Sequence, residues 1–221
     1  MIAVGNNTIT NAYLGDKVIK SVYLGTNKLF TNLPYDAEIE YLEVTENGPY
    51  IDTGFFPTYK TRVVADVQTA GVHGFLFGAR GTSSSTSPTQ FVFGVTGTTS
   101  FRTDYFGTSK TATVTNTTHR AIIDKNANVT NAFDATVTNT AVSSGSVAYP
   151  MYIFVFNNAG TPASSYGLMK LYSFKIYNDD GSLARDFIPV RTGTEGCLYD
   201  KVEKKIYKNV GTGAFVLGAD K

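Results

Sequence analysis

The stretch LMKLYSFKIY, residues 168–177, is followed by the turn sequence NDDG at 178–181 and then by a second apolar stretch, Leu183–Val190. Apolar side chains stand at both odd and even positions of the first stretch, which predicts a strand covered on both faces. The NDDG segment is typical of a tight turn, so Leu183–Val190 is expected to pair back as a hairpin. Pro189 stands near the end of that partner, where a missing N–H donor costs least. The hairpin therefore predicts the centre of a sheet.

Short strands recur along the chain at spacings of roughly 8–15 residues, and no long helix is evident. The segment Tyr152–Phe156 is apolar at both parities and is also expected to lie centrally. A dozen or so such strands without helices favour an all-β jelly-roll sandwich of two antiparallel sheets packed face to face. The other expected strands are Ile39–Tyr41, Tyr50–Thr53, Thr61–Val67, Phe75–Phe77, Phe91–Phe93, Phe101–Phe106, Arg120–Asp124, Val129–Phe133, Leu198–Tyr199, Lys205–Tyr207 and Ala214–Leu217.

The first thirty residues contain a repeat of a different kind. AYLGDKVI at 12–19 is followed ten residues later by VYLGTNKLF at 22–30. Each copy places an apolar run before Gly-Asp or Gly-Thr-Asn, which predicts small β-hairpins that cannot bury a core alone. We therefore expect a β-hairpin attachment module at residues 1–34, ending at Pro34, and a sandwich at 35–221. The side chains expected to mediate attachment are Tyr13, Leu14, Tyr23, Leu24 and Phe30.

Composition excludes several classes of function. The formal net charge of the 221-residue chain is +1, and its scattered basic residues argue against a nucleic-acid or membrane-surface partner. No run approaches the ~20 apolar residues of a membrane span, and the N-terminus lacks a signal-peptide pattern, so folding in a cytoplasm is expected. The single cysteine, Cys197, excludes an internal disulfide and is expected to fill the core.

An ordered series of motifs then resembles one recurrent domain: EYLEVT at 40–45, YIDTGF at 50–55, LYSFKIY at 171–177, RDFIPVR at 185–191, LYDK at 198–201 and YKN at 207–209. The series is similar to the concanavalin A-like, laminin-G-like sandwich of phage and gut-bacterial proteins, over about residues 37–218. The N-terminal Tyr-Leu-Gly repeat resembles short modules of bacteriophage tail and other virion proteins. Together the resemblances imply a multi-copy virion protein that is assembled in the bacterial host cytoplasm and attached to other virion proteins by its N-terminal module.

Glu38, Glu40 and Glu43 are the candidate catalytic residues, because glycosidases of the concanavalin-like class resemble this pattern of carboxylates along one strand. A retaining mechanism needs two carboxyl groups about 5–5.5 Å apart. Glu40 stands where that family typically has Asp, Glu43 needs a bulge to reach the same face, and the chain has no Trp to line a sugar cleft. The sequence therefore favours a protein that is not an enzyme.

Metal binding is the next possibility, since laminin-G-like domains often hold Ca²⁺ through carboxylates at a loop rim. Ca²⁺ needs six to eight oxygen ligands, and the aspartates Asp52, Asp104, Asp124, Asp179 and Asp180 are dispersed in the sequence. Turn formation alone explains the Asp179–Asp180 pair. His73 and His119 are far apart and have no partner at metal-ligand spacing. We therefore expect no metal and no cofactor.

Carbohydrate binding by a non-catalytic sandwich needs an exposed aromatic platform for the apolar face of a sugar and polar groups for its hydroxyls. Tyrosines with polar neighbours are the best candidates for such a platform, although packing in the core is the commoner role of an aromatic residue in a β-protein. The candidate binding residues are Tyr59, Arg102, Asp104, Tyr105, Asn157, Asn158 and Tyr166.

These patterns predict a non-enzymatic bacteriophage virion protein of the tail, fibre or head whose sandwich binds host-surface carbohydrate during adsorption. The Ser-rich segment at 81–88 and the tyrosine-bearing loops would face outward. Two alternatives remain open. One is a purely structural capsid decoration or fibre subunit that makes only protein–protein contacts, and the other is a glycan hydrolase.

Overall fold

The computed structural model describes residues 33–82 and 87–221 in full and, within the first 32 residues, only the backbone of six short strands. The chain divides into two compact units, Met1–Asp36 and Ala37–Lys221. No helix occurs in the described residues, so none there could cross a membrane. Residues 83–86 of the Ser-rich segment lie outside the described residues. The same holds for the side chains expected to mediate attachment, Tyr13, Leu14, Tyr23, Leu24 and Phe30.

The N-terminal unit contains three antiparallel pairs of strands. The first pair is β1 (Ala3–Val4) with β2 (Asn7–Thr8). The two copies of the Tyr-Leu-Gly repeat give β3 (Ala12–Leu14) with β4 (Lys17–Ile19), and β5 (Ser21–Leu24) with β6 (Asn27–Thr31). The hairpins expected from the repeat are confirmed.

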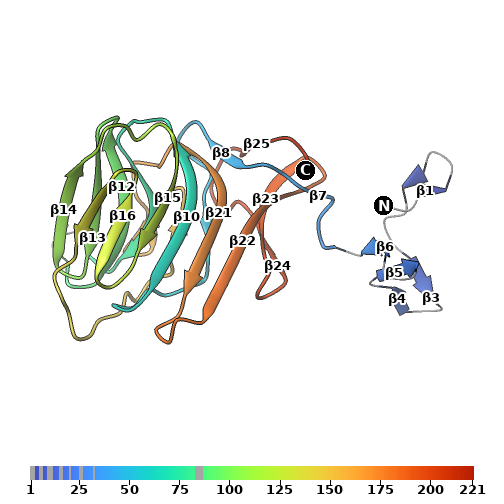
Figure 1. Cartoon of the computed structure of the whole chain (residues 1–221), viewed down its shortest axis with the longest axis horizontal. Coiled ribbons are helices and arrows are strands. Elements are labelled where there is room, and N and C mark those ends of the chain that lie inside the picture. Colours follow the sequence, from blue (N-terminus) through green and yellow to red (C-terminus); the bar gives the residue numbers. More distant parts are fainter. Residues whose placement is uncertain are drawn as a thin grey trace. The chain divides into compact units, whose positions relative to one another are not determined.

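The larger unit contains an antiparallel sheet of 11 strands. The predicted central hairpin is β21 with β22, and β10 lies on the other side of β21 (Figure 1). The main path runs β17 (Ala135–Thr138), β16 (Val129–Ala132), β15 (Arg120–Lys125), β10 (Arg62–Thr69), β21 (Met169–Tyr177), β22 (Leu183–Thr192), β23 (Glu195–Asp200) and β24 (Lys205–Tyr207). The short strands β7 (Ala37–Glu38), β8 (Leu42–Val44) and β25 (Val216–Leu217) attach beside β21 and β22.

The second sheet has eight strands. Its path runs β14 (Thr108–Thr113), β13 (Ser100–Tyr105), β12 (Gln90–Gly97), β11 (Gly74–Arg80), β18 (Tyr152–Ile153) and β9 (Ile51–Asp52). The hairpin of β19 (Phe156–Asn158) and β20 (Thr161–Pro162) adds to β11, and β19 runs parallel to it. Every other pair of strands in the two sheets is antiparallel.

The two sheets enclose one apolar core. Phe77 of the eight-stranded sheet packs edge-on against Phe174 of the other sheet, with ring centroids 5.2 Å apart. Phe77 also stacks on Phe93, and both rings are fully buried, as is Cys197. Burying each large aromatic side chain contributes about 2–3 kcal/mol, which makes this interface the main source of stability. The predicted sandwich of two antiparallel sheets is confirmed.

Two details of the predicted central strands are wrong. In β21 only alternate side chains are buried, and its outward Tyr172 carries the Arg120 guanidinium 3.7 Å above its ring. Long side chains therefore cover this face, not a further layer of chain. The segment 152–156 is buried on both faces as expected, but it is not one strand, because Phe154 adopts a φ of 75° and ends β18 before β19 begins.

A lysine lies inside the core. Lys125 at the end of β15 is fully buried, and its Nζ donates a hydrogen bond of 2.6 Å to Thr103 Oγ1 of the opposite sheet. The ammonium also lies 4.6 Å from the centre of the Phe91 ring. These contacts replace water only in part, so burial lowers the pKa of Lys125 from 10.5 to about 7, while the charge of Asp104 opposes that shift.

Replacing Lys125 with Met should stabilise the sandwich. The unfolded chain keeps a proton on Lys125 up to about pH 10 whereas the folded chain releases it near pH 7, so the free energy of unfolding rises with pH in this window. Lys125→Met should raise this free energy by about 1–4 kcal/mol at neutral pH and flatten the rise. Urea denaturation between about pH 6 and 9 measures both, with the exposed Lys201→Met as control. If the free energy of unfolding rose equally with pH in wild type and in Lys125→Met, the lowered pKa given to Lys125 would be contradicted.

Candidate functional site

The outer face of the eight-stranded sheet carries a second apolar cluster, separate from the core. Its buried members are Val92, Tyr152, Val155, Phe156 and Ala163, and Tyr50, Phe75 and Tyr166 pack against them. The outer face of a sandwich sheet is ordinarily polar. An apolar cluster on that face therefore marks this side of the sheet as the place to seek a binding site.

Two glycines hollow this face. The cross-strand row Phe75, Gly94 and Arg102 has no side chain at its centre, so Arg102 reaches over Gly94 and its guanidinium lies 5.8 Å from the centre of the Phe75 ring. A Cβ at Gly94 would come within 2.9 Å of Phe75 Cδ1. In the next row Gly78, with a φ of 142°, stands between Phe156 and Val92. The missing side chains leave a depression between aromatic rings and arginines.

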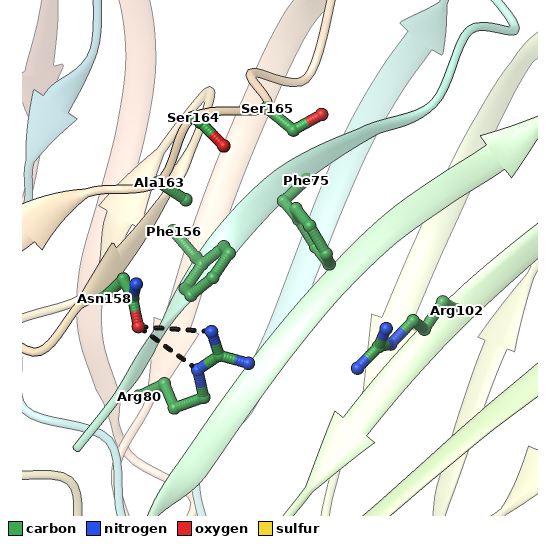
Figure 2. A pocket seen from close by; sticks show the side chains of 8 residues that line it. All are labelled: Phe75, Arg80, Arg102, Phe156, Asn158, Ala163, Ser164 and Ser165. Carbon is green, nitrogen blue, oxygen red and sulfur yellow. Dashed lines mark hydrogen bonds between the residues drawn. The ribbon is translucent and has the colours of Figure 1, made fainter. Parts of the chain in front are cut away.

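This depression is a pocket of about 320 Å³, which we call the aromatic pocket (Figure 2). Its volume is at the lower end of the range for small-molecule sites, ~300–1,000 Å³. Figure 2 shows the two guanidinium groups pointing toward one another from opposite sides, with the phenylalanine rings between them and the serines. The lining residues are Phe75, Arg80, Arg102, Phe156, Asn158, Ala163, Ser164 and Ser165.

Arg80 forms one wall of the aromatic pocket at the end of β11. Its Nε and Nη2 donate hydrogen bonds of 3.3 and 3.1 Å to Asn158 Oδ1, and its guanidinium carbon lies 4.8 Å from the centre of the Phe156 ring. Burial lowers the pKa of Arg80, the charge of Asp104 raises it, and the like charge of Arg102 lowers it further. Arg80 thus rests on an amide and an aromatic ring, and no carboxylate of the described residues forms an ion pair with it.

Arg102 forms the opposite wall and is held differently. Its Nε and Nη2 donate to the two carboxylate oxygens of Asp104 at 2.7 and 2.9 Å, because residues two apart on β13 share a face. Asp104 itself is only 1% exposed, so it lies under the guanidinium and does not reach solvent. The pair fixes the direction of Arg102 across the sheet.

The loop that brings Ser164 and Ser165 to the pocket is anchored at several points. Asn47 Nδ2 donates to Ser164 O at 3.1 Å, and the Phe75 amide donates to Ser165 O at 3.3 Å. Ser165 Oγ lies 3.1 Å from His73 Nδ1, and the His73 ring meets the Phe75 ring edge-on at 5.6 Å. The serine hydroxyls are therefore part of a positioned wall.

The residues predicted for sugar binding are only partly brought together. Arg102 and Asn158 line the aromatic pocket, and Asp104 lies beneath it. Tyr166 is half-buried beside the pocket, where its ring meets Tyr50 at 6.4 Å.

The prediction that Tyr105 is exposed is wrong, and Asn157, which was predicted to bind sugar, is buried as well. Tyr105 is 1% exposed because it alternates with Asp104 and so points into the core, where its hydroxyl donates to Tyr59 O. Tyr59 packs against the same core. Asn157 is buried because its side chain bonds the turn around it, donating to Pro150 O at 3.0 Å and accepting from the Gly160 amide at 2.8 Å.

The sequence prediction missed Phe75, Arg80 and Phe156. The segment FLF at 75–77 is predicted as a strand, and regular alternation would place both of its rings on the same face. The register of β11 against β12 shifts between Phe75 and Phe77, however, so that Phe75 turns outward. Arg80 ends the otherwise uncharged segment FLFGAR at 75–80, and a charged side chain at that position indicates that this end of the strand faces solvent.

The carboxylates considered for metal binding or catalysis form no comparable site. Among the described residues, no group of three His, Cys, Asp or Glu side chains is placed to hold a metal ion. Asp180 accepts hydrogen bonds from Ser182 in the predicted turn, and Asp124 pairs with Arg62. Glu38 and Glu40 are both exposed on the other sheet, where β7 pairs with β22.

The ion pair beneath the aromatic pocket should matter far more for stability than a similar pair on the surface. Asp104→Asn leaves the half-buried Arg102 without its counter-charge and should lower the free energy of unfolding by about 2–4 kcal/mol. The matched control is Asp124→Asn, whose partner Arg62 is 45% exposed, and its cost should stay below about 1 kcal/mol. Urea denaturation of both variants measures the difference. Equal losses would contradict the structural role given to Asp104.

No protein-family model matches the chain, and comparison with the curated proteins finds no match. Among solved structures, the chain is similar to the "putative carbohydrate binding protein" from Bacteroides ovatus ATCC 8483, with a TM-score of 0.53. The two sequences are 9% identical, and the similarity covers 83% of this chain and 61% of the other, so the chain spans about three fifths of that structure's length. At this identity the similarity concerns the fold alone, a two-sheet β-sandwich.

Proposed function

We propose that this protein is a non-enzymatic carbohydrate-binding protein and that the aromatic pocket is its sugar site. The observation that carries the proposal is the meeting of Phe75, Phe156, Arg80 and Arg102 in one hollow on a sheet face that is otherwise expected to be polar. The outward ring of Phe75 offers a platform for the C–H groups of a sugar ring. Guanidinium, amide and hydroxyl groups around it supply bonds to sugar hydroxyls.

The similar fold of the Bacteroides ovatus protein supports the proposal, since its name also refers to carbohydrate binding. The series of motifs from EYLEVT at 40–45 to YKN at 207–209 also supports carbohydrate binding, because it resembles laminin-G-like sandwich domains. Neither observation identifies the glycan. The pocket is short, so we propose that it takes one end or one residue of a host-surface glycan and not a long stretch of it.

The absence of enzymatic activity is part of the proposal. Glycoside hydrolysis needs two carboxyl groups facing the substrate. The eight residues lining the aromatic pocket include no Asp or Glu, and the nearby Asp104 is buried under Arg102. The pocket therefore offers donors and an aromatic surface but no general acid or base of the kind that glycosidases use.

The role of the N-terminal unit is a proposal on the resemblance of its repeat. We propose that Met1–Asp36 attaches the chain to other virion proteins of a bacteriophage, in several copies per particle. The sandwich would then present its aromatic pocket to the host surface. This arrangement implies assembly in the bacterial cytoplasm before release.

Removing the aromatic platform should weaken sugar binding without unfolding the protein. A glycan array with the full chain first identifies a bound glycan, and calorimetric titration with that glycan then measures its affinity. Phe75→Ala should weaken binding about tenfold or more, which corresponds to ~1.4 kcal/mol. Phe56→Ala is the matched control, because Phe56 is 52% exposed and lies outside the pocket lining. A purely structural subunit would bind no glycan, and a loss shared by both variants would place the sugar elsewhere.

Deleting Met1–Leu33 should separate attachment from binding. The remaining chain keeps every strand of the sandwich, so it should fold and bind the same glycan as the full chain. Incorporation into phage particles should be lost. Circular dichroism, calorimetry and electron microscopy of particles test these three outcomes. A truncated chain that unfolds would show that the first unit belongs to the main core.

A further inference from the structure

The two arginines of the aromatic pocket carry more charge than the site needs for a neutral sugar. Arg80, Arg102 and the buried Asp104 together leave one net positive charge at the pocket. Asp104 is bound in a bidentate pair by Arg102, so it is not free to neutralise Arg80. The pocket thus holds a partly buried guanidinium whose partners are an amide oxygen and an aromatic ring.

The geometry of the donors suits an anion. A guanidinium has five N–H donors, and Asn158 accepts from only two nitrogens of Arg80. Figure 2 shows the third nitrogen of Arg80 pointing across the pocket toward Arg102. Arg102 likewise uses Nε and Nη2 for Asp104, which leaves its Nη1 group. Donor groups on opposite walls therefore face one another across the pocket (Figure 2).

We infer that the aromatic pocket selects a carboxylated sugar, such as a uronic or nonulosonic acid, over its neutral counterpart. This inference rests on the proposed function and names the substrate class of the same site. A sugar carboxylate between Arg80 and Arg102 would receive charge-assisted N–H bonds from both sides while its ring lies on Phe75. Such bonds are stronger in a partly buried pocket than in water, because the local dielectric constant is lower.

A neutral sugar would meet a less favourable situation. Its hydroxyls would accept bonds from the guanidinium groups, but Arg80 would still face the like charge of Arg102 with no carboxylate of its own among the described residues. The lowered pKa of Arg80 agrees with this view, since it results chiefly from burial and in part from the charge of Arg102. A bound carboxylate would offset both effects.

The test compares each acidic glycan with its own neutral form. Polygalacturonate, alginate, hyaluronan and polysialic acid oligomers are titrated into the full-length protein beside the same oligomers after carboxyl reduction, which replaces –COO⁻ by –CH₂OH. At least one acidic oligomer should bind ten or more times tighter than its reduced form. The preference should shrink as sodium chloride is raised. These comparisons use the wild-type chain and do not depend on the folding of a variant.

Variants then test whether Arg80 causes the preference for the acidic oligomer over its reduced form. Arg80→Met should bring the affinity for the acidic oligomer down to that for its reduced form, whereas Arg80→Lys should keep part of the preference as a point charge. Arg62→Met is the matched control, because Arg62 is an ion-paired arginine on the other sheet. Phe75→Ala should weaken the binding of both forms.

The outcomes separate this inference from the proposed function. Equal binding of acidic and reduced oligomers, or binding only to neutral glycans, would overturn the carboxylate inference and leave carbohydrate binding intact. Tighter binding of a sulfated heparin oligosaccharide than of every carboxylated one would also overturn it, in favour of sulfate. If no glycan of any kind binds, the proposed function fails and this inference falls with it.

Discussion

One irregular position in β11 decides where the candidate site lies. Phe75 pairs with Gly94 and Phe77 pairs with Phe93, so Leu76 is an extra residue in the ladder. In a regular ladder without this bulge, residues 75 and 77 would share a face and both rings would enter the core. With the bulge, Leu76 and Phe77 are buried between the sheets while Phe75 turns outward. The contact of Phe75 with Arg102 across Gly94 depends on this shift, as does the edge-on contact of its ring with Phe156 at 4.7 Å.

Arg80 differs from the ion-paired arginines of the sandwich. On the 11-stranded sheet, Arg62 pairs with Asp124 and Arg120 pairs with Asp66, each across neighbouring strands. These pairs occupy the exposed face and need nothing further. On the eight-stranded sheet, Arg80 meets Asn158, which accepts hydrogen bonds but carries no charge. Arg62, Arg120 and Arg102 thus each have a carboxylate partner, whereas the charge of Arg80 has none among the described residues, and this difference marks the pocket as a place where an external anion can bind.

The sequence predicted the parts of the fold that depend on local patterns. The hairpin at 168–190 was recognisable because an apolar run, a turn and a second run follow each other directly. The burial of Cys197 followed from its type alone. The aromatic pocket could be predicted only in part, from the polar residues Arg102 and Asn158, because Phe75 and Phe156 look like core residues in any alternating pattern. Their position on the outer face depends on a register shift and on a positive φ at Phe154, and neither has a clear sequence signal.

Asp104 links the pocket to the interior of the sandwich. Its carboxylate bonds Arg102 on the outer face, while its neighbour Thr103 points inward and accepts the hydrogen bond from the buried Lys125. The same negative charge raises the pKa of Arg80 and opposes the lowering of the pKa of Lys125. One carboxylate therefore offsets three cations on both sides of a single strand. Because Asp104 is shared in this way, it cannot fully compensate any one of them. Arg80 stands in the wall of the pocket and has no ion pair among the described residues, so it is the cation that an external anion can compensate.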